Sequence, residues 1–204
     1  MNFRPVASSG FPLVELLIVV AIIAILAAIA VPNFLDAQIR SKVSRETSDL
    51  RTVATALEAY ATDNSAYPPH GEILSNGTVN FPAVQGGLST MEYLCDWPLT
   101  SPVAFLTSIP VDPFLEKKAG SLQQRYGYVE TRQMVSVMTS HGLGSSAAKL
   151  EPRYGAWRLY AAGPDGDRTD AKQGILYDPT NGTVSNGDLV RSQRNPVEFL
   201  SSDE

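Results

Sequence analysis

The hydrophobic pattern begins with a long apolar run near the N-terminus. From Leu16 to Val31 there is no polar side chain, and Leu13 to Val31 comes to 19 residues. A helix needs about 20 apolar residues to cross the hydrocarbon core of a bilayer, so the run is long enough to span a membrane. Because it is apolar on all sides, it suits lipid or the interior of a helical bundle.

After Pro32 the pattern becomes amphipathic, which predicts a single helix from Leu13 to Thr62, about 75 Å long at 1.5 Å per residue. Its second half is predicted to pack on a globular head, and Pro32 is predicted to kink or locally melt it. Apolar residues recur at helical spacing at Val43, Leu50, Val53, Ala54, Leu57, Tyr60 and Ala61. Charged residues occupy the other faces at Arg40, Lys42, Arg45, Glu46, Asp49, Arg51 and Glu58.

The remaining chain predicts an α+β fold in which a small antiparallel sheet lies across the second half of the long helix. Residues 66–123 are rich in Gly, Pro, Ser and Asn and predict a connecting region with one short helix around residues 100–106. Asn181-Gly182 predicts a hairpin turn, and residues 141–153 predict a surface loop. Strands are predicted over 125–139, 154–162, 174–177 and 183–190.

The charge and the cysteine content exclude some classes of protein. The 204-residue chain has a net charge of -5 and no cluster of Lys and Arg, which argues against a nucleic-acid-binding protein. Cys95 is the only cysteine, so no intramolecular disulfide stabilises the head.

Three interpretations of the first 35 residues stay open on these patterns alone. A secretory signal peptide would have an apolar stretch of about 7–15 residues and a small-residue cleavage site, whereas this run is longer and leads into Pro32-Asn33. A plain membrane anchor fits the length, and Arg4 favours a cytoplasmic N-terminus. The third interpretation is an anchor that later becomes the core of a polymer.

Glu15 distinguishes the second interpretation from the third. A carboxylate near the end of a membrane span is tolerated, but an ionisable residue in a membrane usually has a partner, and this segment has no cation of its own. If the chain were cut after Gly10, Phe11 would carry a free α-amine four residues from Glu15. A neighbouring helix would then bring its own amine to that carboxylate.

The stretch from Gly10 to Leu16, GFPLVEL, resembles the processing motif of type IV pilins and type II secretion pseudopilins. The resemblance implies that a prepilin peptidase cuts between Gly10 and Phe11 and methylates the Phe11 amine. It also implies that Phe11 and Glu15 set the register between subunits, and Pro32 matches the family as well. Two residues depart from the usual motif, since Pro12 stands in place of Thr and Ser9 in place of a basic residue.

The resemblance implies a type IV pilin-like fold and three segments. Residues 1–10 form a leader peptide, residues 11–32 the transmembrane and filament-core half of the helix, and residues 33–204 the head with the amphipathic half. The implied partners are copies of the same chain, the prepilin peptidase, an inner-membrane assembly platform and minor pseudopilins, with no nucleic acid. The chain would cross the inner membrane once with its head in the periplasm, and would then join a periplasmic pseudopilus or an extracellular filament.

One acidic loop is a candidate cation site. Asp165, Asp167 and Asp170 lie close together in sequence and offer the hard oxygen ligands that calcium prefers. The major pseudopilins carry calcium in a loop at this place in the chain, so the resemblance implies calcium here. The alternative is that Asp, Gly and Pro simply form turns.

No sequence motif predicts an enzyme. The serines lack a G-x-S-x-G elbow, there is no Gly-rich phosphate loop, and His70 and His141 are isolated from other metal-ligand residues. The resemblance to the pseudopilins instead implies a structural subunit of a helical pseudopilus that polymerises at the inner membrane and drives protein export by type II secretion. The alternatives are a type IV pilus subunit for adhesion, motility or DNA uptake, and a membrane-tethered module that binds a ligand.

Overall fold

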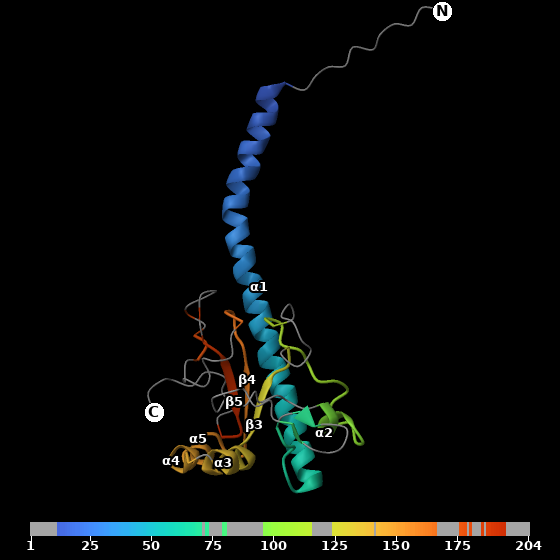
Figure 1. Cartoon of the computed structure of the whole chain (residues 1–204). Helices are drawn as coiled ribbons and strands as arrows, with labels where there is room; N and C mark the ends of the chain where they lie inside the picture. Colours follow the sequence, from blue (N-terminus) through green and yellow to red (C-terminus); the bar gives the residue numbers. More distant parts are fainter. Residues whose placement is uncertain are drawn as a thin grey trace, which may run out of the picture. The chain divides into compact units, whose positions relative to one another are not determined.

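The structure is a computed structural model that describes residues 12–70, 72–73, 79–80, 96–115, 124–140, 142–166, 176–178, 180, 185 and 187–194. The chain divides into two compact units, residues 1–39 and residues 40–204, and each is described by itself. The first unit contains the beginning of the long helix, and the second contains the rest of that helix and the head (Figure 1).

The predicted long helix is confirmed as α1, Leu13–Asn64. The Pro12 carbonyl accepts the Glu15 N–H at 3.1 Å, which closes the first turn of the helix. A proline just before a helix suits this position because its missing N–H would have no partner in the first turn. Pro32 lies inside the helix, which continues through it, so the predicted local melting is wrong, and the kink predicted there stays a prediction.

Residues 40–64 of α1 bury one face against the head. The periodic positions Val43, Leu50, Val53, Ala54 and Leu57 are buried as predicted, and Ala56 joins them. The assignment of Glu46 to a polar, solvated face is wrong, because this side chain is 0% exposed. Spacing alone placed Glu46 with the charged residues, but the helix turn presents it to the same buried side as Val43 and Leu50.

The head contains a three-stranded antiparallel sheet, which confirms the predicted α+β fold. Strands β3 (Gly127–Glu130), β4 (Trp157–Ala161) and β5 (Leu189–Ser192) lie in the order β3-β4-β5. Tyr128 is opposite Leu159 in the first pair, and Leu159 is opposite Arg191 in the second. A separate pair of short strands, β1 (Glu72–Ile73) and β2 (Val79–Asn80), is also antiparallel.

The strand predicted over residues 125–139 is correct only in its first part. Strand β3 ends at Glu130, and helix α3 (Thr131–Ser140) follows it directly. Met134 and Met138, four residues apart, pack on a cluster of Val129, Tyr160 and Val190, so this segment buries an apolar face at helical spacing. Within this segment only Val135, Ser136 and Val137 alternate apolar with polar, and the strand prediction extended this short alternation from Tyr126 and Tyr128.

Three other predictions of short elements are wrong. The loop predicted over residues 141–153 contains helices α4 (Gly144–Ala147) and α5 (Leu150–Tyr154), which pack against α3 beside the sheet (Figure 1). The short helix is α2, Asp96–Thr100, and it shares only Thr100 with the predicted range 100–106. The strand predicted over 174–177 is wrong at its described residues 176 and 177, where Leu176 forms only an isolated parallel bridge with Asp188. The Asn181-Gly182 turn lies outside the described residues.

Candidate functional site

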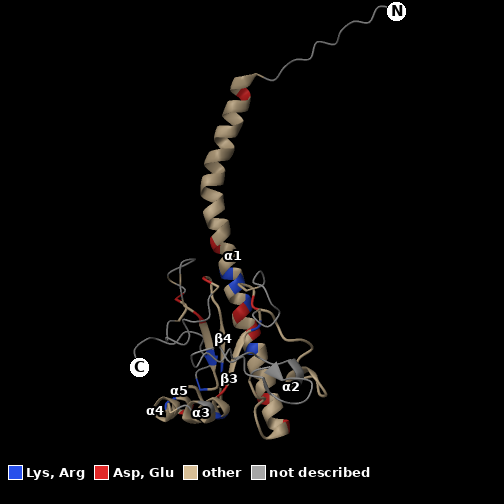
Figure 2. Cartoon of the chain, viewed as in Figure 1, with Lys and Arg blue, Asp and Glu red and all other residues tan. Residues whose placement is uncertain are grey.

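The N-terminal half of α1 presents an apolar surface on all sides. Every Leu, Ile, Val and Phe side chain from Leu13 to Leu35 is at least half exposed, from 50% at Val19 to 78% at Leu13. Figure 2 shows that charged residues gather on the C-terminal half of the helix and are almost absent from this one. Among the described residues, α1 is the helix that is long and apolar enough to cross a membrane, and its apolar window has no buried residue.

Glu15 is the only charged residue between Leu13 and Leu35, and it lies in the first turn of α1. A carboxylate is favourable at this place because unpaired N–H groups give the helix N-terminus a partial positive charge. The proposed cleavage residues Gly10 and Phe11 lie outside the described residues. The structure therefore places Glu15 at the exposed apolar end and leaves the processing motif as a prediction.

The other half of α1 is fixed to the head by polar contacts around Glu58. One carboxylate oxygen of Glu58 accepts the indole N–H of Trp157 at 2.8 Å, and the other accepts the Tyr67 hydroxyl at 2.9 Å. The Gln193 amide donates to the same Tyr67 hydroxyl at 2.7 Å, which links the residue after β5 to this network. Burial, and then the hydrogen bond with Glu58, raises the pKa of Tyr67 to about 12, so it remains a hydroxyl donor at neutral pH.

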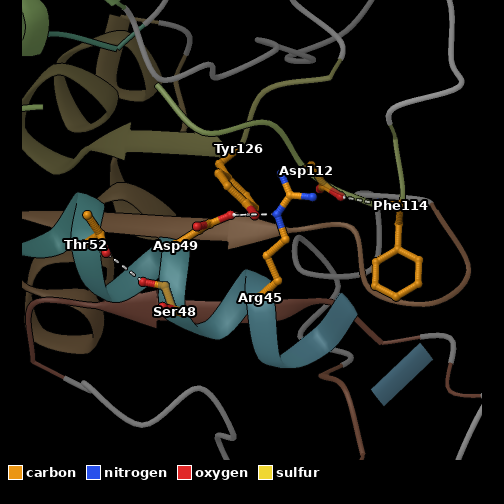
Figure 3. Close-up of polar contacts among 7 residues, drawn as sticks. All are labelled: Arg45, Ser48, Asp49, Thr52, Asp112, Phe114 and Tyr126. Carbon is orange, nitrogen blue, oxygen red and sulfur yellow. Dashed lines mark hydrogen bonds and ion pairs between the residues drawn. The ribbon is translucent and has the colours of Figure 1, made fainter. Parts of the chain in front are cut away.

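A second set of contacts lies about two and a half to three and a half turns towards the N-terminus of α1 from Glu58 (Figure 3). The Tyr126 hydroxyl, just before β3, donates to Asp49 at 3.0 Å, and Arg45 lies 3.8 Å from the same carboxylate. Asp112 accepts the backbone N–H of Phe114 at 2.9 Å and that of Ala162 at 3.0 Å.

Lys42 connects α1 to the Asp112 turn. Its ammonium donates to the carbonyl of Pro113 at 3.1 Å and lies 5.0 Å from the centre of the Phe114 ring. Asp112 in turn accepts the backbone N–H of Ala162 at the end of β4. Together, the contacts of Lys42 and Asp112 join α1, the turn and the sheet. The stretch from residue 109 to residue 114, which sequence analysis did not single out as a site, is therefore a structural contact between elements.

The predicted cation loop is described only in part. Asp165 is exposed in a turn over residues 163–166, where Gly163 and Gly166 have φ angles of 62° and 66° and the Gly166 N–H donates to the Gly163 carbonyl at 3.2 Å. Such positive φ angles favour glycine. Asp167 and Asp170 lie outside the described residues. Within the described part of the chain, no group of three His, Cys, Asp or Glu side chains is placed to hold a metal ion.

Sequence analysis missed two buried titratable residues in the head. One is Glu46 on α1. The other is His70, which was predicted to be isolated in a loop and is 1% exposed. The Nδ1 atom of His70 accepts the backbone N–H of Glu130 at 3.1 Å, at the end of β3. Burial, with a further contribution from the charge of Arg158, lowers the pKa of His70 to about 4. Neither residue belongs to a sequence motif that could have marked it.

These features define a class of protein. An apolar helix long enough to span a membrane continues as an amphipathic helix, and the amphipathic part packs on a small antiparallel sheet. This is the architecture of a pilin-like subunit.

Curated relatives agree with this class. The type IV major pilin protein PilA of Myxococcus xanthus is 50% identical over 66 residues, which are 32% of this chain and 30% of that protein. The type II secretion system core protein G of Pseudomonas aeruginosa is 43% identical over 60 residues, 29% of this chain and 42% of that protein. The core protein G of Escherichia coli is 26% identical over 166 residues, 78% of this chain and 83% of that protein.

The chain thus spans less than half the length of the first two relatives. No protein-family model matches the sequence, and no solved structure matches it. By its fold and these relatives, the chain is similar to both type IV pilins and type II secretion pseudopilins.

Proposed function

We propose that this chain is a structural subunit of a helical pseudopilus that polymerises at the inner membrane and drives protein export by type II secretion. The observation that supports this most is the exposed apolar half of α1. Burying apolar surface stabilises by about 25 cal/mol per Å², so a subunit in water would not leave this helix half uncovered. A membrane before assembly and the same helix half of neighbouring subunits after assembly would both cover it.

The choice of a pseudopilus over a pilus has weaker support, because the relatives include both. The single Cys95 favours a pseudopilus, since a filament exposed at the cell surface benefits from disulfides. A deletion strain distinguishes the two functions. The proposal predicts that the strain retains secreted enzymes in the periplasm and keeps its surface pili and motility. Normal secretion with loss of surface filaments would instead identify a pilus subunit.

We propose that the chain is processed between Gly10 and Phe11 and that the new Phe11 amine is methylated. The support is the motif around Glu15, together with the position of Glu15 in the first helical turn. Intact mass and N-terminal sequencing of membrane-extracted protein test this. The expected mature chain begins with methylated Phe11, and recovery of a chain that begins at Met1 contradicts the proposal.

We propose that Asp165, Asp167 and Asp170 bind calcium in the head. The support is their spacing and the turn at Gly163–Gly166, which exposes Asp165. The full chain in detergent should melt at a higher temperature with calcium than with chelator, and Asp167→Ala should abolish most of that rise. Asp63→Ala, which removes an exposed carboxylate near the end of α1, should keep the rise. A wild-type melting curve that calcium does not move contradicts calcium binding.

The proposed role is structural and not enzymatic, which accords with relatives named as pilins and secretion-system core proteins. The proposed location is the inner membrane, crossed once by α1, with the head on the periplasmic side. The proposed partners are copies of the same chain, the prepilin peptidase, the assembly platform and minor pseudopilins. A cysteine placed in the head at an exposed position such as Glu151 should react with a membrane-impermeant reagent in intact spheroplasts, and lack of reaction contradicts this orientation.

A further inference from the structure

Three carboxyl groups are buried where residues 40–64 of α1 meet the head. Glu46 comes from α1, Asp112 from the turn that follows residue 111, and Asp188 from the position before β5, and each is 0% exposed. Removing an ion from water costs several kcal/mol unless good partners compensate for the lost hydration. Three negative charges at one buried place would also repel one another, so at least one group needs to be neutralised.

Glu46 is the carboxyl group whose lost hydration is least compensated by hydrogen bonds. Both oxygens of Asp112 accept backbone N–H groups, whereas no N–H or O–H group of the described residues donates to either carboxyl oxygen of Glu46, and its hydrogen-bonding neighbour is the acceptor Asp112. The cations on the same face of the contact have other partners, since Arg45 lies beside Asp49 and Lys42 donates to a carbonyl. A buried carboxylate without a partner is unfavourable, but a buried carboxylic acid is much less so.

The titratable neighbours of Glu46 also favour its protonated form. Burial makes the largest contribution, and the negative charges of Asp112, Asp188 and Asp49 add to it, raising the pKa of Glu46 to about 10. Tyr126 and Tyr177 also interact with Glu46, and burial raises the pKa of each.

We propose that Glu46 is a neutral carboxylic acid in the folded protein and that losing its proton loosens the head from α1, so this contact responds to pH. The unfolded chain releases this proton above the ordinary value of 4.5, while the folded chain holds it up to a pH of about 10. The contribution of Glu46 to stability is therefore complete below pH 4.5 and is lost as the pH rises towards 10. Each pH unit in this window favours unfolding by about tenfold.

The test measures urea unfolding of the full chain in detergent between pH 7 and pH 9, with Glu46→Gln as the main variant. The amide is nearly isosteric with the protonated acid and cannot ionise. The ratio of the wild-type to the variant unfolding constant should grow about tenfold per pH unit. Glu151→Gln, which removes an exposed carboxylate from α5, should keep the wild-type slope. Glu46→Met provides the same comparison with an apolar side chain.

Infrared spectroscopy of the folded wild-type protein at pH 7 gives a second readout. The carbonyl stretching band of a protonated carboxyl group should be present in the wild type and absent from Glu46→Gln. Equal pH slopes in wild type and both Glu46 variants, or no such band in the wild type, would overturn the proposal. So would a wild-type slope that disappears when calcium or magnesium is added, because a cation would then neutralise the cluster.

Discussion

Single polar side chains determine how tightly the head holds α1, and Glu58 is the clearest example. Its carboxylate accepts hydrogen bonds from both Trp157 and Tyr67, and the Trp157 side chain is almost fully buried. A buried donor that loses its acceptor costs about 1–3 kcal/mol, more than the net contribution of an ordinary hydrogen bond. Loss of the Glu58 carboxylate is therefore expected to lower the free energy of unfolding by more than the loss of one ordinary hydrogen bond.

Glu58→Ala should lower the free energy of unfolding by about 1–3 kcal/mol, because the indole N–H of Trp157 is left without an acceptor. Glu58→Gln keeps one carbonyl oxygen and should lose less. Urea unfolding of the full chain in detergent, followed by near-ultraviolet circular dichroism, measures both variants. Equal stability of Glu58→Ala and the exposed-site control Glu151→Ala would show that the Trp157 contact contributes nothing.

His70 gives the head a second dependence on pH, opposite in sign to that of Glu46. The folded pKa of about 4 lies below the ordinary value of 6.5, so the unfolded chain binds the proton first as the pH falls. Stability from neutral His70 is present above pH 6.5 and is lost as the pH falls towards 4. Between pH 4.5 and 6.5 the two residues oppose each other, so the wild-type protein should show little change in stability there.

Replacing Glu46 by Gln should reveal the effect of His70. In that variant, stability should fall by about 2 kcal/mol between pH 6.5 and pH 5. Adding His70→Asn, which keeps an acceptor near the Nδ1 position, should remove most of this fall, whereas His141→Asn should leave it. Urea unfolding across this pH range measures the change. If the double variant Glu46→Gln with His70→Asn lost the same amount of stability between pH 6.5 and pH 5, groups other than His70 would be responsible for the loss.

At the scale of elements, the two halves of α1 have different environments. Leu50 is fully buried against the head, while Leu26, in the apolar half, is 61% exposed. Leu50→Ala should lower the free energy of unfolding of the head by about 2–5 kcal/mol, because it removes buried methyl groups and leaves a cavity. Leu26→Ala in detergent should leave head unfolding unchanged. Similar losses for the two variants would contradict the division of the helix into two halves.

The long helix was predictable because its signals are long and consistent. The apolar run and the periodic positions from Val43 to Leu57 extend over many turns; one continuous helix covers both, and burial confirms the periodic positions. In residues 131–140 a short alternation at Val135–Val137 favoured a strand, whereas Met134 and Met138 at helical spacing pack on Tyr160 and Val190 as a helix. Glu46 and His70 are buried by tertiary contacts that no local pattern records.

At the scale of the whole molecule, the central claim is that copies of this chain assemble through the apolar half of α1. The head carries polar contacts of its own, but the apolar half needs a cover that a single copy in water does not supply. Glu15 is the one charged group of that surface. Replacing it should therefore impair assembly and leave membrane insertion intact. Removing a charge from a membrane segment also makes insertion easier.

The most direct test is electron microscopy of fibres from cells that overproduce the chain with its assembly platform. The wild-type chain should form helical filaments labelled by antibody against the head. Glu15→Val should reach the membrane in equal amount, as cell fractionation would show, but should form few or no filaments. A wild-type chain that stays as single membrane-bound copies, or Glu15→Val filaments as abundant as wild type, would contradict the account.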